Sequence, residues 1–149
     1  MSVRRLNHAV LYVSDAARSA AFYREALGMT VVEDLGPAVF LALPGSGNHH
    51  DLGLFQVPAG SAARGPGLYH LAWEVDSFAD LVERRAALLE LGALRGESDH
   101  GVSLSLYSHD PDGIEFEVMW PLPESAWGQY ADHAVTQRLD WAAASARWS

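Results

Sequence analysis

The segment Leu6-Asn-His8-Ala-Val-Leu-Tyr-Val13 is the first of two similar strands. Its counterpart, Leu68-Tyr-His70-Leu-Ala-Trp-Glu-Val75, follows 62 residues later. Both segments alternate between core-forming residues and others, as a half-buried β-strand does, and both carry a histidine at the third position. An internal repeat of this kind indicates that the chain is built from two similar modules.

A helix is expected after each of these strands. The first covers about residues 14–27 and the second about 77–91, with Asp80 as a capping partner near the second start, and each ends at a glycine, Gly28 or Gly92. One stripe of the second helix is predicted to pack on a sheet, and it comprises Phe78, Leu81, Val82, Leu88 and Leu89.

Three further strands follow each predicted helix. They cover residues 30–33, 38–43 and 51–57 in the first half and 94–97, 102–107 and 114–120 in the second. The sequence therefore predicts an α+β fold, a single domain (residues 1–120) of two βαβββ modules that form a curved mixed sheet. The modules span about 4–57 and 66–120, joined by a Pro-, Gly- and Ala-rich linker (58–67). Residues 121–149 form a tail, with a helix expected over about 136–148.

Composition limits the function. The chain has 149 residues, enough for one domain with a proper core, and 49% of them are hydrophobic. A net charge of −9 argues against nucleic acid and against anionic membrane surfaces as partners. Cysteine is absent, so thiolate metal sites and disulfides are excluded. Long apolar runs are also absent, and we expect a cytoplasmic protein.

A second informative stretch runs from His100 to Glu117 and reads as strand, tight turn and strand. Alternation places Leu104 and Leu106 of its first strand on one face, and Phe116 and Val118 of its second strand form a matching core face. The opposite faces carry Ser103, Ser105 and Tyr107 on one strand and Glu115, Glu117 and Met119 on the other. Those side chains must meet either solvent or a pocket.

Three of these residues are candidate metal ligands. His8 and His70 hold equivalent places in the repeat, and Glu117 lies on the last strand of the second module. If the two histidine-bearing strands lie near each other about a pseudo-twofold axis, two imidazoles and one carboxylate converge. That is the ligand set of non-haem iron oxygenases, with coordination positions left open. The alternative is that each histidine is an ordinary structural residue.

These residues together resemble the vicinal oxygen chelate superfamily, which includes glyoxalases, fosfomycin and bleomycin resistance proteins and type I extradiol dioxygenases. The resemblance extends to Trp120. The pattern His100-x5-Leu106-Tyr107-x2-Asp110-Pro111-x-Gly113-x3-Glu117 is similar to the signature of extradiol, catechol 2,3-dioxygenase-like enzymes. The doublet His49-His50 also resembles one in those enzymes.

The resemblance implies a role for each residue. His8, His70 and Glu117 would bind a divalent metal, most simply Fe(II), alternatively Mn(II), Ni(II) or Zn(II). His50 would be the acid–base residue, Tyr107 would hydrogen-bond a substrate hydroxyl and His100 would be a further donor near the substrate. The implied activity is extradiol cleavage of a catecholic or other vicinal-oxygen substrate by dioxygen. His109 and His133 are expected to be bystanders.

Two other functions stay open. A glyoxalase-like isomerase or lyase would need a fourth ligand at Gln56, which an offset of 61 residues matches to Glu117. A non-catalytic protein that binds a flat aromatic ligand, as resistance proteins do, would need no metal. The chain also departs from the extradiol pattern, since Ser98 is unusual at its place and most such enzymes are about twice this length. A homodimer is expected, because sheet edges and the tail residues Trp127, Trp141 and Trp148 would otherwise be exposed.

Overall fold

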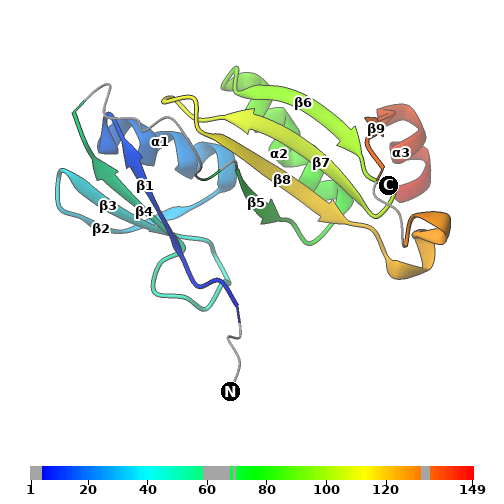
Figure 1. Cartoon of the computed structure of the whole chain (residues 1–149), viewed down its shortest axis with the longest axis horizontal. Helices are drawn as coiled ribbons and strands as arrows, with labels where there is room; N and C mark the ends of the chain where they lie inside the picture. Colours follow the sequence, from blue (N-terminus) through cyan, green and yellow to red (C-terminus); the bar gives the residue numbers. More distant parts are fainter. Residues whose placement is uncertain (1–4, 59–67, 69, 132–134) are drawn as a thin grey trace. The chain divides into compact units, whose positions relative to one another are not determined.

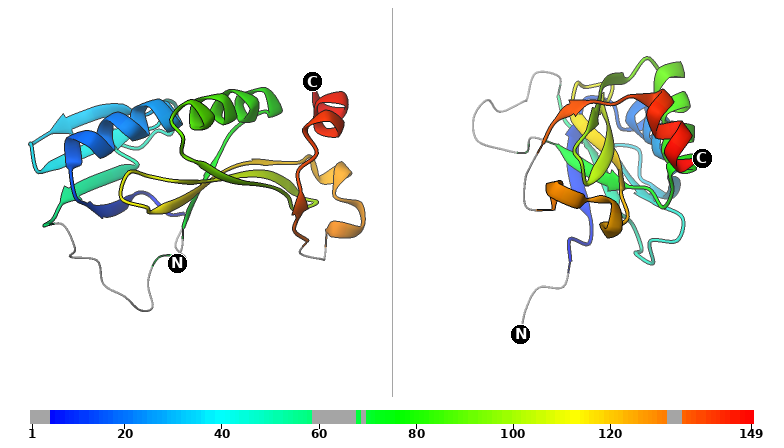
Figure 2. Two further views of the ribbon diagram at one scale, coloured as in Figure 1. Left: turned by 90° about the horizontal axis from the view of Figure 1, so that it is seen from above. Right: turned by 90° about the vertical axis from the view of Figure 1, so that its right-hand side faces the viewer.

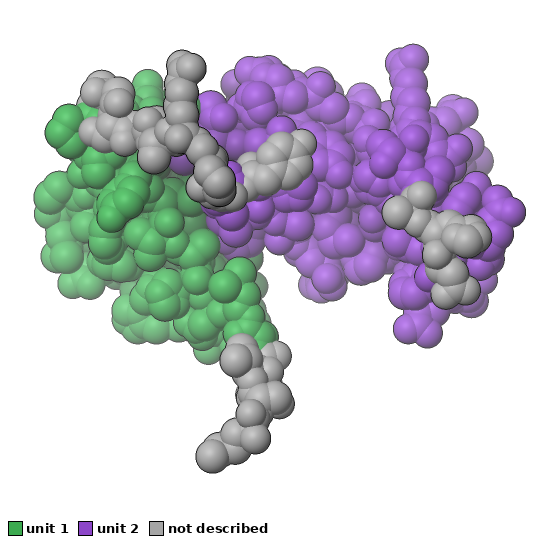
Figure 3. All heavy atoms as spheres, in the orientation of Figure 1, with its two compact units in different colours: residues 1–67, 110–112 green, residues 68–109, 113–149 purple. Residues whose placement is uncertain are grey.

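The computed structural model of the chain describes residues 5–58, 68, 70–131 and 135–149. These residues group into two compact units, coloured separately in Figure 3. Unit 1 is Met1–Gly67 with Asp110–Asp112, and unit 2 is Leu68–His109 with Gly113–Ser149. Most of the predicted linker, residues 59–67, and His133 lie outside the described residues.

Unit 1 has the order β1 (Ala9–Val13), α1 (Ala16–Leu27), β2 (Thr30–Asp34), β3 (Ala38–Ala42) and β4 (Leu52–Gln56). Its sheet runs β1-β4-β3-β2, with β1 parallel to β4 and the other pairs antiparallel (Figure 1). The helix packs against β3 and β4 (Figure 2). Burial alternates along β1, so Leu11 and Val13 enter the core while Val10 and Tyr12 stay on the outer side, and His8, just before the strand, is exposed.

Unit 2 repeats this order with β5 (Leu71–Glu74), α2 (Phe78–Glu90), β6 (Leu94–Asp99), β7 (Ser103–His109) and β8 (Glu115–Pro121). Its sheet runs β5-β8-β7-β6-β9, where β5 is parallel to β8 and the remaining pairs are antiparallel. The α+β class and the paired βαβββ modules are confirmed, each module having a mixed sheet of its own.

Side-chain caps hold both module helices where the sequence predicts them. The Asp15 carboxylate accepts from Arg18 N, and the Ser77 hydroxyl accepts from Asp80 N. Gly28 ends α1 with φ +70°, a backbone conformation that side chains disfavour. The caps explain why the predicted helix bounds lie within two residues of the observed ones.

The predicted stripe of α2 is only partly correct. Phe78, Leu81 and Leu88 are buried, but Val82 is 42% and Leu89 50% exposed. Each exposed residue directly follows a buried one and is therefore rotated about 100° away from the sheet. Arg85 takes the place between Leu81 and Leu88 on the buried stripe, where it forms an ion pair with Glu97 and lies over the Trp141 ring at 4.7 Å.

The tail folds onto unit 2 rather than extending from it. Two short 3-10 turns, Glu124–Ala126 and Gly128–Tyr130, lead to β9 (Gln137–Arg138), which pairs with β6, and then to α3 (Trp141–Trp148). The helix predicted over 136–148 is wrong at its start, because β9 continues the sheet and Asp140 caps α3 through Ala142 N and Ala143 N.

The tail tryptophans are packed within the unit and do not form the exposed surface that was predicted. Trp148 meets Trp120 edge to face at 5.2 Å between ring centroids, and Trp141 lies 6.0 Å from Phe78. The indole of Trp127 donates to Leu122 O at 2.8 Å. These contacts bury part of each tail tryptophan within unit 2.

The turn Asp110-Pro-Asp-Gly113 has a structural role, as predicted. Asp110 accepts a hydrogen bond from Tyr23 Oη at 3.1 Å and another from Asp112 N. Asp112 accepts from Ser14 N at 2.8 Å. Burial, reinforced by Asp110, raises the pKa of the Tyr23 hydroxyl far above its usual range, so it remains a donor. Gly113 supplies the φ of +82°.

Candidate functional site

Strand register in unit 2 gathers a group of histidines and carboxylates on one face. Tyr107 lies directly opposite Glu117, and His109 directly opposite Glu115, across the β7–β8 pair. Leu71 of the parallel neighbour β5 is level with Phe116, so His70, one residue earlier, is level with Glu115. The opposite face is core, where Phe116 and Val118 are fully buried. Cross-strand neighbours on one face are within side-chain reach of one another.

The imidazole of His70 lies between two carboxylates. Its Nδ1 is 3.2 Å from Glu115 Oε1 and its Nε2 is 3.3 Å from Glu117 Oε2. A neutral imidazole carries one N–H, so it can donate to only one of the two carboxylates. The second nitrogen then presents a lone pair to a carboxylate oxygen. Such a contact is favourable only when a cation, either a proton or a metal ion, lies between the two atoms.

The dimensions suit a metal ion. Bonds of about 2.0–2.2 Å to nitrogen and oxygen put two ligand atoms at right angles about 3 Å apart. The separation of His70 Nε2 and Glu117 Oε2 is close to this value. Glu117 is buried, and a buried carboxylate needs a cationic or hydrogen-bonding partner. Imidazole and carboxylate together suit Fe(II), Mn(II) and Zn(II).

Tyr107 and His100 form a hydrogen-bonded pair beside this group. His100 Nε2 is 2.8 Å from Tyr107 Oη, and His100 Nδ1 is 2.8 Å from Val135 O. Because a carbonyl oxygen only accepts, Nδ1 carries the proton of the neutral ring and Tyr107 donates to Nε2. The Tyr107 oxygen is then oriented to accept a hydrogen bond, for instance from a hydroxyl. His70 is close, its ring centroid 5.9 Å from that of Tyr107.

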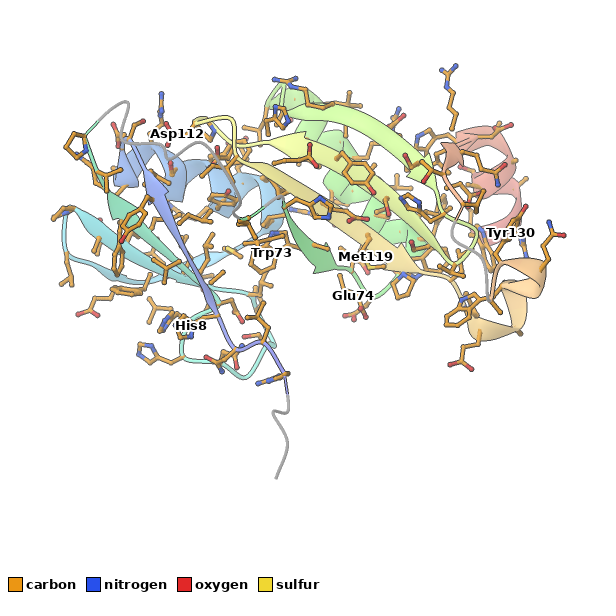
Figure 4. All side chains as sticks on the ribbon, viewed as in Figure 1. His8, Trp73, Glu74, Asp112, Met119 and Tyr130 are labelled. Carbon is orange, nitrogen blue, oxygen red and sulfur yellow. The ribbon has the colours of Figure 1, made fainter. Side chains whose placement is uncertain are left out.

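His8 directly precedes β1 in unit 1 (Figure 4). Its Nδ1 is 2.9 Å from Asn7 Oδ1, and the Asn7 amide nitrogen donates to Asn48 Oδ1. The amide orientation makes Asn7 Oδ1 an acceptor, so His8 carries its proton on Nδ1. The tautomer matches that of His70 when it donates to Glu115. In both cases Nε2 is left as the coordinating nitrogen.

His50 packs against His8. The two ring centroids are 4.5 Å apart, and the Phe40 ring meets His50 from another side at 5.0 Å. Partial burial lowers the pKa of His50 below its ordinary value, charges on His8 and His49 act in the same direction and Asp51 opposes them. His50 therefore lies beside the candidate ligand His8. His49 is exposed and also contacts His50, with 3.2 Å between the two Nδ1 atoms.

Asp51 and Asn48 hold the loop that carries His50. Asp51 is buried and accepts from Leu43 N and from the Asn48 amide, both at 2.7 Å. Asn48 also donates to Asn7 O. Burial favours the protonated form of Asp51, but its hydrogen bonds and the Arg5 charge outweigh it and lower the pKa of the carboxyl.

The register of unit 1 corrects the predicted match between Gln56 and Glu117. Gly53 lies opposite Val10 and Phe40, as Glu117 lies opposite Ala72 and Tyr107. Gly53 is therefore the equivalent of Glu117, and Phe40 that of Tyr107. Gln56 is on the same face of β4 as the buried residues Leu52 and Leu54, and its side chain accepts from Ala16 N.

The predicted site residues fall into two groups. Unit 1 brings together His8 and His50, and unit 2 brings together His70, Glu117, Tyr107 and His100. Within the described parts of the chain, no three or more His, Asp or Glu side chains are arranged to hold an ion, so the three-ligand set stays a prediction. Sequence reasoning left out Glu115 and took His109, 3.6 Å from Glu115, for a bystander. The sequence did contain a signal for both residues, because strand alternation places Glu115 on the face of Glu117 and His109 on the face of Tyr107.

The two modules also correspond to a known family. Residues 5–118 match the family model of the Glyoxalase/Bleomycin resistance protein/Dioxygenase superfamily. The chain belongs to this superfamily.

Individual relatives agree with the assignment. Over 119 residues the chain is 34% identical to biphenyl-2,3-diol 1,2-dioxygenase 3 of Rhodococcus globerulus, covering 76% of this chain and 62% of that protein. It is 24% identical to the manganese-dependent 2,3-dihydroxybiphenyl 1,2-dioxygenase of Geobacillus genomosp. 3, covering 79% and 37%. A glyoxylase/bleomycin resistance protein/dioxygenase domain from Frankia sp. EAN1pec superposes with a TM-score of 0.69 at 25% identity, covering 83% and 96%. The present chain therefore spans less than two thirds of the length of each of these two dioxygenases. No described helix of it has the length and apolar character needed to cross a membrane.

Proposed function

We propose that this superfamily member is a metal-dependent extradiol-type dioxygenase that cleaves the ring of a catecholic or other vicinal-oxygen substrate. The observation that carries the proposal is the imidazole of His70 between Glu115 and Glu117, with the Tyr107–His100 pair beside it. The names of the two dioxygenase relatives support an aromatic diol as substrate and dioxygen as co-substrate.

In this proposal His70, Glu117 and His8 hold the metal. Two neutral imidazoles and one carboxylate leave a divalent ion with a net charge near +1 and with positions for exogenous ligands. The two vicinal oxygens of the substrate would chelate a divalent ion so held, and the ion would supply Lewis-acid activation and an open position for dioxygen. Fe(II) is our first choice, and the manganese-dependent relative makes Mn(II) the second.

Tyr107 and His50 act on the substrate rather than on the metal. The Tyr107 oxygen, whose hydrogen is directed to His100, accepts a hydrogen bond from a substrate hydroxyl and orients the ring. His50 takes and returns a proton at the substrate oxygen. Its contacts with His8 and Phe40 keep its ring within reach of a ligand bound at His8.

The register of unit 1 favours the dioxygenase over a glyoxalase-like isomerase or lyase with four protein ligands. The residue equivalent to Glu117 is Gly53, which offers no side chain, and Gln56 is engaged at the start of α1. A non-catalytic protein that binds an aromatic ligand is the remaining alternative. It would bind the ligand without metal, so metal analysis of untagged protein separates it from the enzyme.

The direct test is oxygen uptake after anaerobic reconstitution. Protein loaded with Fe(II) or Mn(II) is mixed with catechol and with 2,3-dihydroxybiphenyl, and we expect oxygen consumption together with a yellow ring-opened product. Metal-free protein is the control. Bound metal without oxygen uptake on any substituted catechol would overturn the dioxygenase assignment while leaving the metal site intact.

A further inference from the structure

A carboxylate beside His70 and Glu117, that of Glu115, takes no part in the proposed reaction. Glu115 lies on the same face of β8 as Glu117, level with His70 on one side and with His109 on the other. Its Oε1 is 3.2 Å from His70 Nδ1, and its Oε2 is 3.6 Å from His109 Nε2. The first separation is that of a hydrogen bond, whereas the second is a looser electrostatic contact.

The two nitrogens of His70 therefore face different carboxylates. When Nε2 binds a metal ion that Glu117 shares, the proton of the neutral ring must be on Nδ1, and Glu115 is the acceptor in place for it. A ring free to flip would lose the coordinating nitrogen from this position. Partners of this kind orient metal-binding histidines in many proteins and make the imidazole a stronger ligand.

We propose that Glu115 is the positioning residue of the metal site, which selects the Nδ1–H tautomer of His70 and thereby strengthens metal binding. The inference rests on the proposed function only in taking His70 as a ligand. His109, whose Nε2 is 3.6 Å from Glu115 Oε2, is placed as an outer member of the same group.

Substitution of Glu115 tests the inference through metal affinity. Co(II) is the probe, because its visible spectrum reports ligand geometry and its affinity can be measured by competition with a chelating dye. Glu115→Leu should weaken Co(II) binding by about 10- to 100-fold and alter the spectrum. Glu115→Gln keeps an oxygen that accepts from Nδ1, so it should restore most of the affinity.

A matched control exists in the same sheet. The Glu97 side chain is 23% exposed and that of Glu115 is 24%, but Glu97 forms its ion pair with Arg85 of α2. Glu97→Gln should leave Co(II) affinity and spectrum unchanged. Thermal melting of each metal-free variant establishes that it is folded.

A second measurement does not depend on any variant. The ¹⁵N chemical shifts of the His70 ring in wild-type protein loaded with diamagnetic Zn(II) should report the Nδ1–H tautomer. Equal Co(II) affinity in wild type and Glu115→Leu, or the opposite tautomer, would overturn the role of Glu115 alone. A wild-type protein that binds no Co(II) would overturn this inference and the proposed metal site together.

Discussion

In the proposed metal site two histidines would have the same protonation pattern but obtain it from different partners. His70 would donate from Nδ1 to a carboxylate, and His8 from Nδ1 to the amide oxygen of Asn7. An anionic partner makes an imidazole more electron-rich than a neutral amide does. The two candidate ligands are therefore unequal, and His70 should bind a metal more strongly than His8.

Replacing either histidine should remove the metal and leave the fold. His8→Ala and His70→Ala each delete a side chain that lies outside the core, so the expected loss is in affinity rather than in stability. Metal content after dialysis is compared with thermal melting of the metal-free proteins. Wild-type metal stoichiometry in both variants would contradict the three-ligand set.

His50 should be needed for turnover but not for metal binding. It packs on His8 from a loop that Asp51 and Asn48 hold in place, and the role assigned to it is proton transfer. His50→Gln should retain metal and substrate binding and lower kcat by roughly 100-fold or more, as for a lost acid–base catalyst. Turnover of His50→Gln at the wild-type rate would remove the assigned role.

Asp51 should make stability depend on pH. Its hydrogen bonds hold the pKa of the carboxyl below the usual value, so its stabilising contribution is present above about pH 4 and is lost as pH falls through the folded-state pKa. Asp51→Asn should lower the free energy of unfolding at pH 7 by about 1–3 kcal/mol. Urea titrations at pH 7 and pH 3 should show the difference shrinking in acid. Asp76→Asn, at an exposed aspartate, should show neither effect.

At the scale of elements, local signals predicted the modules but not their register. Matching residue identity aligned Gln56 with Glu117, yet the burial pattern aligns Leu52 and Leu54 with Phe116 and Val118. An odd shift along a strand moves every side chain to the other face. Pattern matching of a short strand cannot detect such a shift, because it depends on hydrogen bonds to neighbouring strands.

The tail shows a second limit of sequence reasoning. The spacing of apolar residues over 136–148 suits a helix, but β9 takes the first part because the edge of β6 offers unpaired backbone groups. The same contact brings Val135 O to His100. Helix caps such as Asp15 and Ser77 were predictable, since their hydrogen bonds join residues three apart, whereas edge pairing joins residues nearly forty apart.

The turn between β6 and β7 should be intolerant of a side chain at Gly101. Its φ is +74°, and an added Cβ would overlap the Tyr130 ring. Gly101→Ala should destabilise the protein by more than the roughly 1–2 kcal/mol that a left-handed conformation alone costs. Gly92→Ala is the control, because Gly92 has a φ of +64° and no atom near an added Cβ, so this variant measures the backbone cost alone. Equal urea midpoints for the two variants would show that Tyr130 adjusts freely.

For the molecule as a whole, we expect a homodimer, now on the basis of sheet edges rather than the tail. β1 is an edge strand of its sheet, and Tyr12 on its outer face is 71% exposed. Exposed apolar edges invite pairing with a second copy. Light scattering should give twice the 16.2 kDa chain mass, and Tyr12→Glu should reduce it, whereas Leu89→Glu on α2 should not. A monomer at micromolar concentration would contradict the expectation.

Gly53 has an implication for how two like halves can diverge. A side chain there would begin with a Cβ 3.3 Å from Val10 Cγ2 and 3.6 Å from the Phe40 ring. The first contact is tight, so Val10 would have to move by a few tenths of an ångström to admit a side chain, whereas the contact with Phe40 is ordinary. The first module therefore has no carboxylate at the register position of Glu117. Loss of the Glu117 carboxylate could not be compensated from the equivalent strand of the other half.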